Sequence, residues 1–299
     1  MDILTIKGLK KSFGDKKVLG GLDLSVPEHS VFGFVGRNGA GKTTTMKAVL
    51  GLLKPDNGDI FVCGEQVVYG QTSTNKYIGY LPDVPNFYSF MTAREYLALC
   101  GESLGMSKKD VIERSNELLA MVGLSDENHR IKGYSRGMKQ RLGIAQALLA
   151  RPKLLICDEP TSALDPIGRK EILDILLSVK DQTTVIFSTH ILSDVERICT
   201  DVALLNDGII AMQGTVDQLK SAHKTEVFHV EMFDNDGAKL LLDAFGDAQL
   251  DANDTLIFSG GEEQLFLVMD YLKQNRIPFR KIERATASLE SLFVEVVKK

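Results

Sequence analysis

The segment Gly36-Arg37-Asn38-Gly39-Ala40-Gly41-Lys42-Thr43 constrains the fold of this chain more than any other feature. It follows the apolar run 31–35 and precedes a helical pattern that starts at Thr44. In that context the pattern GxxxxGK[ST] lets backbone N–H groups converge on phosphates, while the lysine reaches the β and γ oxygens and the threonine can ligate Mg²⁺. The alternative is a glycine-rich turn before a core helix. The pattern predicts a phosphate-binding loop in an α/β fold.

The chain around this loop has the alternating texture of a layered α/β domain. From Asp2 to about Lys220, β-branched runs alternate with amphipathic helical patterns, which indicates a largely parallel sheet. The first thirty residues differ, because "DILTIKGL" and "VLGGLDLSV" alternate apolar and polar positions and predict two antiparallel strands. Buried runs at 31–35, 154–157 and 183–187 each end in polar residues, as strands that lead into a ligand crevice do.

Beyond Lys220 the pattern changes and predicts a second domain. Strands are expected in "TEVFHVEMF", "DTLIFSG" and "FRKIER", and helices near 237–244, 262–274 and 287–298. We therefore divide the chain into a domain at 1–220 and an accessory α+β domain at 221–299, for which we expect a ferredoxin-like sandwich with a terminal helix.

Composition excludes several classes of function. The 35 basic and 40 acidic residues give a net charge of −5 without a basic arm, so no nucleic acid is expected as a partner. The four cysteines are scattered and form no CxxC pair, which argues against a zinc site or a disulfide framework. No transmembrane segment and no signal peptide are predicted, so work at a membrane requires a partner.

Charged residues end two of the buried runs. Asp158 and Glu159 follow the run 154–157, where Asp158 is placed to hold a metal and Glu159 to accept a proton from an attacking water. His190 closes "FSTH", and adjacent parallel strands would bring it to the same crevice. The alternatives are a solvated strand end for the acidic pair and a purely structural role for the histidine.

A second anion-binding feature lies in "YSRGMKQR", residues 134–141, at the start of a helix expected to run to Ala150. Ser135 is a good N-cap, but Met138 stands where a capping box needs Glu or Gln. The N–H groups of the first turn are therefore expected to be free for an anion. One chain thus carries two phosphate-binding features.

These motifs together resemble one family. GRNGAGKTT, YSRGMKQ, LLICDEP, SALDP and STH occur in the order and spacing of the ATP-binding subunits of ABC transporters. The resemblance covers 1–220, and it implies a P-loop NTPase core with an antiparallel β subdomain and a helical subdomain over about 84–150. The form of the signature and the appended domain ending "ASLESLFVEVV" resemble the type-2 exporters of the drug and antibiotic-resistance branch.

The resemblance also implies how the two phosphate-binding features work together. In this family two nucleotide-binding domains meet head to tail, so Ser135 and Gly137 would bind, in trans, the ATP held by the partner's loop. The subunits form a homodimer or a heterodimer and act with a polytopic membrane subunit. The protein is then expected at the cytoplasmic face of the cell membrane, as a peripheral component.

Roles for single residues follow by resemblance, with ATP and Mg²⁺ as the implied ligands. The ATP-binding residues are Phe13, Gly36, Arg37, Asn38, Gly39, Ala40, Gly41, Lys42, Thr43 and Thr44. The catalytic residues are Lys42, Glu159 and His190, and Mg²⁺ is held by Thr43, Asp158 and Asp83. Phe13 matches the aromatic residue that stacks on adenine, with a core aromatic as the alternative. Asp83 stands where the family most often has Gln, and its alternative is to cap the turn before Val84-Pro85.

Two other functions compete with transport. The first is a soluble ABC ATPase that acts on ribosomes or nucleic acid. Proteins of that kind carry two nucleotide-binding domains in one chain, or a long coiled coil between the phosphate loop and the signature, and this chain has neither. The second is a nucleotide-dependent regulatory scaffold whose binding domain is 221–299.

Overall fold

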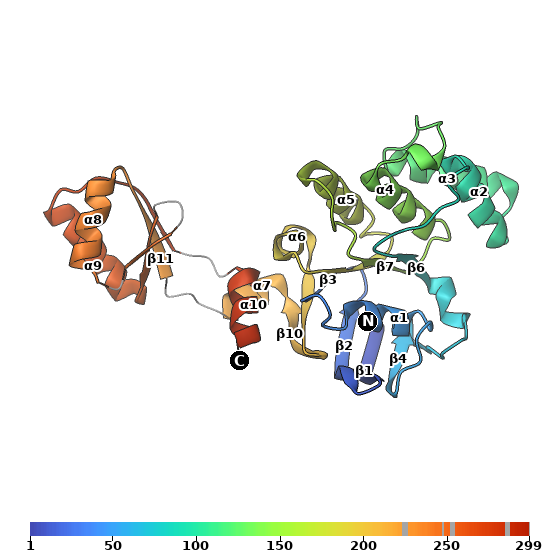
Figure 1. Ribbon diagram of the computed structural model, residues 1–299, viewed down its shortest axis with the longest axis horizontal. Coiled ribbons are helices and arrows are strands. Elements are labelled where there is room, and N and C mark those ends of the chain that lie inside the picture. The colour runs from blue at the N-terminus through green and yellow to red at the C-terminus, as the bar shows by residue number, and fades with distance from the viewer. Residues whose placement is uncertain (223–226, 247, 252–254, 285–287, 299) are drawn as a thin grey trace. The chain divides into compact units, whose positions relative to one another are not determined.

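The computed structural model describes residues 1–222, 227–246, 248–251, 255–284 and 288–298. These residues fall into two compact units (Figure 1). The first unit is built largely from Met1–Val216 and the second from Asp217–Glu295. No helix among the described residues is long and apolar enough to cross a membrane.

An antiparallel sheet opens the first unit. Its strand order is β2-β1-β4-β5, with bounds Asp2–Phe13 (β1), Lys16–Pro27 (β2), Asn57–Val62 (β4) and Glu65–Gln66 (β5). The two strands predicted in the first thirty residues are β1 and β2, which pair antiparallel along their length. Leucine, isoleucine and valine side chains of β1, β2 and β4 are buried in one core with those of the neighbouring sheet.

A six-stranded sheet forms the centre of the unit. Its order is β10-β9-β3-β8-β7-β6, with bounds Val31–Gly36 (β3), Ile78–Leu81 (β6), Leu154–Asp158 (β7), Thr184–Thr189 (β8), Asp201–Asn206 (β9) and Ile209–Thr215 (β10). All neighbours from β9 to β6 are parallel, and β10 alone pairs antiparallel. Every residue of β3, β7 and β8 is buried, as expected for parallel strands covered on both faces.

Helices surround this sheet (Figure 1). They are α1 (Lys42–Val49), α2 (Ala93–Ser103), α3 (Lys108–Met121), α4 (Arg136–Ala147), α5 (Pro166–Ser178) and α6 (Leu192–Ile198), with short 3₁₀ turns at Ser73–Tyr77 and Ile131–Gly133. The helix α7 (Val216–Ala222) starts at the boundary between the units, and its residues after Val216 belong to the second unit. The helix predicted to reach Ala150 ends at Ala147 instead. Arg151 has φ +50 and precedes Pro152, and a residue before proline is disfavoured in the α conformation.

The second unit has the element order β-α-β-β-α-β. The elements are β11 (Val227–Met232), α8 (Asn235–Ala244), β12 (Gln249–Leu250), β13 (Thr255–Ser259), α9 (Gly261–Gln274), β14 (Phe279–Arg284) and the terminal α10 (Leu289–Lys298). The sheet order is β12-β13-β11-β14 and all pairings are antiparallel, which is the arrangement of a split βαβ motif.

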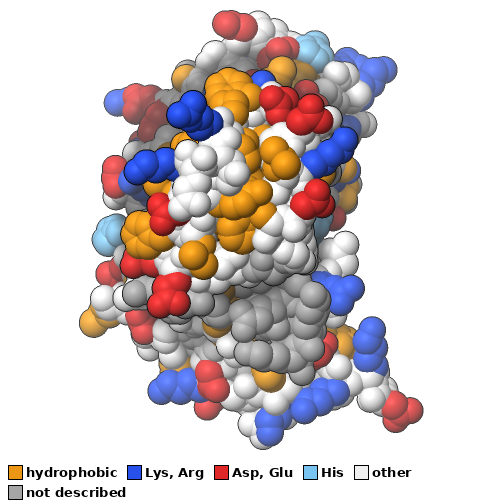
Figure 2. Space-filling view, turned by 90° about the vertical axis from the view of Figure 1, so that its left-hand side faces the viewer, with side chains coloured by type: hydrophobic (Ala, Val, Ile, Leu, Met, Phe, Trp, Pro, Cys, Tyr) orange, Lys and Arg blue, Asp and Glu red, His pale blue; other side chains and the backbone are white. Residues whose placement is uncertain are grey.

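The core of the second unit lies between this sheet and its helices. The rings of Phe228 and Phe258 stack with centroids 5.0 Å apart, against Leu241 of α8 and Val268 of α9. Not every large apolar side chain is in this core. Exposed ones include Leu240, Phe266, Leu267 and Met269, and Figure 2 shows hydrophobic side chains gathered into a patch with charged side chains around it.

Candidate nucleotide-binding site

The phosphate-binding loop joins the end of β3 to the start of α1, as predicted. Gly39 and Gly41 have φ of +84 and +112, a region that residues with a Cβ rarely adopt. A Cβ at Gly41 would also lie 2.7 Å from Leu19 Cδ2. No side chain caps α1, so its first-turn N–H groups remain available at the positive end of the helix. The loop can therefore bind an anion through its backbone.

The ammonium of Lys42 lies inside this loop. Its Nζ donates to the carbonyl oxygen of Gly36 at 2.6 Å and to that of Arg37 at 3.3 Å, and it lies 3.0 Å from Glu159 Oε1. The residue is only 5% exposed, so its charge acts where water screens it weakly. This cation is placed to meet phosphate oxygens.

Asp158 is held in place by Ser188 on the neighbouring strand. The two residues are register partners in the parallel pair β7 and β8, which confirms the predicted adjacency of these strand ends. Ser188 Oγ donates to Asp158 Oδ1 at 2.5 Å and accepts from the Glu159 N–H at 3.0 Å. Sequence reasoning assigned no role to Ser188. Its only signal was its place beside His190 in "FSTH".

Glu159 has a strained backbone. Its φ is +48, and a residue of this kind in the left-handed region costs about 1–3 kcal/mol, which the surroundings must offset. In this backbone conformation the carboxylate points into the site, where Oε2 lies 2.9 Å from His190 Nδ1 and Oε1 lies 3.0 Å from Lys42 Nζ. Three side chains predicted to be catalytic are therefore brought together in one chain.

Asp83 lies on the loop after β6. Its Oδ1 is 3.5 Å from Arg136 Nη2, and its carbonyl oxygen accepts from Gln140 Nε2 at 2.7 Å. Partial burial raises the pKa of Asp83 above its ordinary value, and the negative charges of Asp158 and Glu159 add to this while Arg136 opposes it. The ion pair of Asp83 is therefore with Arg136 of α4.

Phe13 ends β1 and is 52% exposed, so the alternative of a core aromatic is wrong for it. Lys11 Nζ lies 5.4 Å from the centre of its ring. Its register partner Lys16 borders a pocket of about 400 Å³ beside the phosphate loop, which is lined by Lys16, Lys17, Val18, Arg37, Asn38, Gly39, Ala40, Asn206, Asp207 and Gly208. Phe13 itself does not line this pocket.

Ser135 and Gly137 lie at the N-terminus of α4. Ser135 is the N-cap, and its Oγ accepts from the Met138 N–H at 3.2 Å. A Cβ at Gly137 would meet no atom of the described residues closer than 4.0 Å, so no contact among them requires a glycine there. Neither residue shares a hydrogen bond with the phosphate loop in the described residues. Among the described residues, then, no hydrogen bond joins the N-terminus of α4 to the phosphate loop.

A buried network that the sequence did not indicate holds the segment after Glu159. The carboxylate of Asp194, which is 2% exposed, accepts from Thr161 Oγ1 at 2.8 Å and from Arg169 Nε at 2.6 Å. These three residues come from separate elements, so no local pattern could have predicted the network. It ties the turn that carries Glu159 to α5 and α6.

The phosphate loop, the buried lysine and an acidic pair at the end of a neighbouring parallel strand define a P-loop nucleotide hydrolase. The sequence model of the ABC transporter family matches residues 19–162. The chain belongs to the ATP-binding proteins of ABC transporters and is an ABC-type ATPase.

Two curated relatives show how far the likeness extends. The uncharacterized ABC transporter ATP-binding protein YxlF of Bacillus subtilis is 45% identical over 76% of this chain and 75% of its own. The bacitracin transport ATP-binding protein BcrA of Bacillus licheniformis is 35% identical, over 99% of this chain and 97% of its own. The second alignment includes the accessory unit.

Solved structures agree with this fold. An ATP-binding subunit of an ABC transporter superposes with a TM-score of 0.65 at 31% identity, over 74% of this chain and 92% of that one. The dimeric structure of a post-hydrolysis state of an ATP-binding cassette, bound to ADP and Pi, superposes with a TM-score of 0.63 at 25% identity, over 71% of this chain and 98% of that one.

Proposed function

We propose that this protein is the ATP-hydrolysing subunit of an exporter and that ATP joins two such subunits head to tail to drive a separate membrane subunit. The name of BcrA as a bacitracin transport protein supports transport, and the match to BcrA covers nearly the whole chain. Export of an antibiotic-like compound is the finer part of the proposal. The polytopic partner places the protein at the cytoplasmic face of the membrane.

The observation that carries the proposal is the N-terminus of α4. Ser135 caps the Met138 N–H, while the N–H groups of Arg136 and Gly137 precede the first intrahelical hydrogen bond. A Cβ at Gly137 would have Leu164 Cδ2 and Ser135 Oγ as its nearest neighbours in the described part of the chain, both at 4.0 Å, which leaves space beside these N–H groups. A second subunit's γ-phosphate fits such a helix end, where an anion gains about 0.3–1 kcal/mol when exposed and up to ~2 when partly buried.

The site residues suit ATP with Mg²⁺. The backbone from Gly36 to Thr44 would hold the phosphates with Lys42, and Phe13 would lie against adenine. The exposed Thr43 and the carboxylate of Asp158 are hard oxygen donors, and Ser188 engages one of the two oxygens of Asp158. Mg²⁺ usually takes one or two carboxylates together with phosphate oxygens, so these donors fit it, and it would neutralise phosphate charge.

The roles of the acidic and imidazole groups follow from their contacts. Glu159 would act as the general base, since its carboxylate is directed into the site by its backbone and lies beside His190. His190, 44% exposed in its side chain, would contact the γ-phosphate and orient Glu159. Loss of that phosphate on hydrolysis would loosen the dimer, which provides the two-state element that transport needs.

The helical subdomain offers a surface for the membrane subunit. Val84, Tyr88 and Phe90 lie in one segment and are 55–63% exposed. The ring of Tyr88 lies 5.9 Å from that of Phe90 and 6.3 Å from that of Tyr96, a buried residue of α2. Large exposed apolar side chains that cluster on a monomer mark an interaction surface. The cluster lies on the segment that leaves Asp83, so a partner bound there would be connected to the nucleotide site.

The substitution Glu159→Gln tests the proposal. It keeps size and removes the base, so ATP turnover should fall about 10²- to 10⁴-fold while ATP still binds. Size-exclusion chromatography with light scattering should then show a dimer that forms with ATP and not with ADP. Co-purification of the tagged chain with a polytopic membrane protein tests the transport role.

Two outcomes would contradict the proposal. Turnover at the wild-type rate in the Glu159→Gln protein would show that another group is the base. Purification with ribosomes, in place of a membrane protein, would favour the soluble ABC ATPase that competes with transport.

A further inference from the structure

One face of α4 is bound to the loop that carries Asp83. Arg136, Gln140 and Gly143 lie at i, i+4 and i+7 and so share this face. Arg136 pairs with the Asp83 carboxylate, and Gln140, which is 1% exposed, donates to the Asp83 carbonyl oxygen at 2.7 Å.

The third residue of the face, Gly143, has no side chain, which lets the neighbouring segment pack closely against the helix. A Cβ there would lie 2.4 Å from Leu81 Cδ1 and 3.4 Å from Pro85 Cβ. Because Gly143 has no side chain, Leu81 and Pro85 on either side of Asp83 can pack directly against α4. The segment that carries Asp83 is therefore packed on the same helix that presents Ser135 and Gly137.

Arg136 is an unusual residue at its position. It is the first residue of α4, and the positive end of a helix disfavours a cation. Its charge is met by Asp83 at 3.5 Å, with the two side chains 44% and 48% exposed. An ion pair this exposed contributes little and exchanges readily. Arg136 also lies between Ser135 and Gly137, where we place the partner's γ-phosphate.

We propose that Arg136 exchanges Asp83 of its own chain for the γ-phosphate bound to the partner subunit. This inference rests on the proposed head-to-tail dimer and adds a connection between its two sites. A guanidinium binds phosphate in a bidentate, charge-assisted manner, which is stronger than a half-exposed pair with one carboxylate oxygen. Once released, Asp83 is free to turn toward Asp158 and Glu159 of its own site. ATP on one subunit thereby acts on the other.

The exchange predicts that substitutions of Asp83 and of Arg136 have opposite effects on ATP-dependent dimerisation. In the Glu159→Gln background, Asp83→Asn should lower the ATP concentration for half-maximal dimer by about 1.5- to 5-fold, the range that exposed ion pairs contribute, because Arg136 no longer has a competing anion. Arg136→Gln should raise that concentration by at least about tenfold, as expected for a lost bond to a charged group. In the double variant Asp83→Asn should have no further effect.

Light scattering across ATP concentrations at excess Mg²⁺, and across Mg²⁺ concentrations at saturating ATP, measures all of these values. ATP binding by each monomeric variant at its usual affinity verifies folding. Lys132→Gln is the matched control, since it removes an equal charge from an exposed residue of the turn Ile131–Gly133 and should change nothing.

The possible results separate the alternatives. A raised Mg²⁺ requirement with Asp83→Asn, without a lower ATP concentration for half-maximal dimer, would make Asp83 only a metal ligand and overturn the exchange. If Asp83→Asn lowered the ATP concentration for half-maximal dimer equally with and without Arg136, the cause would be relief of negative charge alone. That result would also overturn the exchange. Absence of any ATP-dependent dimer in Glu159→Gln alone would instead contradict the proposed function.

Discussion

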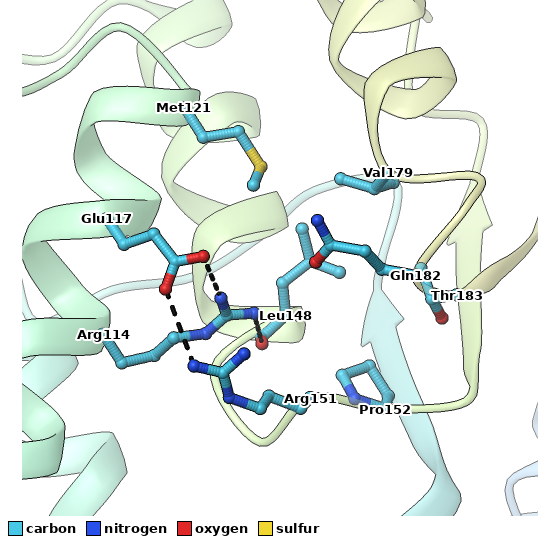
Figure 3. A pocket seen from close by; sticks show the side chains of 9 residues that line it. All are labelled: Arg114, Glu117, Met121, Leu148, Arg151, Pro152, Val179, Gln182 and Thr183. Atoms are coloured by element: carbon cyan, nitrogen blue, oxygen red, sulfur yellow. Dashed lines mark hydrogen bonds and ion pairs between the residues drawn. The ribbon is translucent and has the colours of Figure 1, made fainter.

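The substitution Glu117→Gln should weaken the joint between α3 and the end of α4. Figure 3 shows this joint at the edge of a pocket of about 390 Å³. Arg114, 5% exposed, donates to Glu117 Oε1 at 2.6 Å and to the carbonyl oxygen of Leu148 at 3.0 Å, where Leu148 is the C-cap of α4. The other oxygen of Glu117 lies 3.7 Å from Arg151. The Glu117 carboxylate is thus the ion-pair partner of both Arg114 and Arg151.

The expected loss follows from the burial of Arg114. Removing one partner of a fully buried ion pair costs about 3–5 kcal/mol. A hydrogen bond to a charged group contributes about 1.5–3 kcal/mol. Glu117 is 47% exposed and glutamine still offers a carbonyl oxygen, so we expect a smaller loss of about 1–2 kcal/mol. In a unit of this size, a loss of 1 kcal/mol lowers Tm by about 2–4 °C.

The stability difference between Glu117→Gln and the wild type should depend on pH. The hydrogen bond from Arg114 lowers the pKa of Glu117 below its ordinary value of 4.5. The unfolded chain therefore binds more protons in this range, so the stabilisation is present above the unfolded pKa and is lost as pH falls through the folded one. Urea unfolding should show a constant difference from the wild type between pH 7 and 5.5, and that difference should shrink below the ordinary pKa of the group.

A control on the same helix isolates this effect. Glu113 pairs with Lys109 at 3.9 Å, with side chains 66% and 82% exposed, so Glu113→Gln should cost no more than about 0.5 kcal/mol. The unfolding transition to measure is the one that moves to higher urea concentration when ATP is added, because ATP stabilises the unit that binds it. A separate transition of the second unit would not move in this way. A Glu117→Gln protein as stable as the Glu113→Gln protein at pH 7, or a difference independent of pH, would refute the reasoning.

Two further predictions concern the trans site and the division of the chain. Ser135→Arg should leave ATP binding by the monomer unchanged and abolish the ATP-dependent dimer. Mixing this variant with Lys42→Ala should restore at most one composite site per dimer. Unaltered ATPase activity in pure Ser135→Arg protein would show that the N-terminus of α4 serves packing alone. A chain that ends at Lys220 should remain soluble and bind ATP in a filter assay, with weaker dimerisation at most, whereas an insoluble product would show that the two units share a core.

Local chemistry made the phosphate loop and the grouping of the candidate site predictable. The loop from Gly36 to Thr43 works through its backbone, so the glycine spacing itself specifies the geometry. Buried parallel strands are recognisable as apolar runs, and their carboxyl ends must meet at one edge of the sheet. The grouping of Asp158 with His190 followed from that rule.

The end of a helix was less predictable, because it depends on one residue's conformation. The pattern extended α4 to Ala150, but the left-handed Arg151 before Pro152 ends it at Ala147. The exposure of Phe13 likewise depended on where the hairpin of β1 and β2 ends, and apolarity alone does not decide that.

What the sequence by itself determined is therefore the set of groups that can meet a nucleotide, because each acts through a motif only a few residues long. The tertiary structure alone decided how those groups are held. The positive φ of Glu159, the bond from Ser188 to Asp158 and the pairing of Asp83 with Arg136 each join residues far apart in the chain or impose a strained conformation. Such features arise only when packed strands and helices supply enough energy to hold them, and no local pattern records that energy.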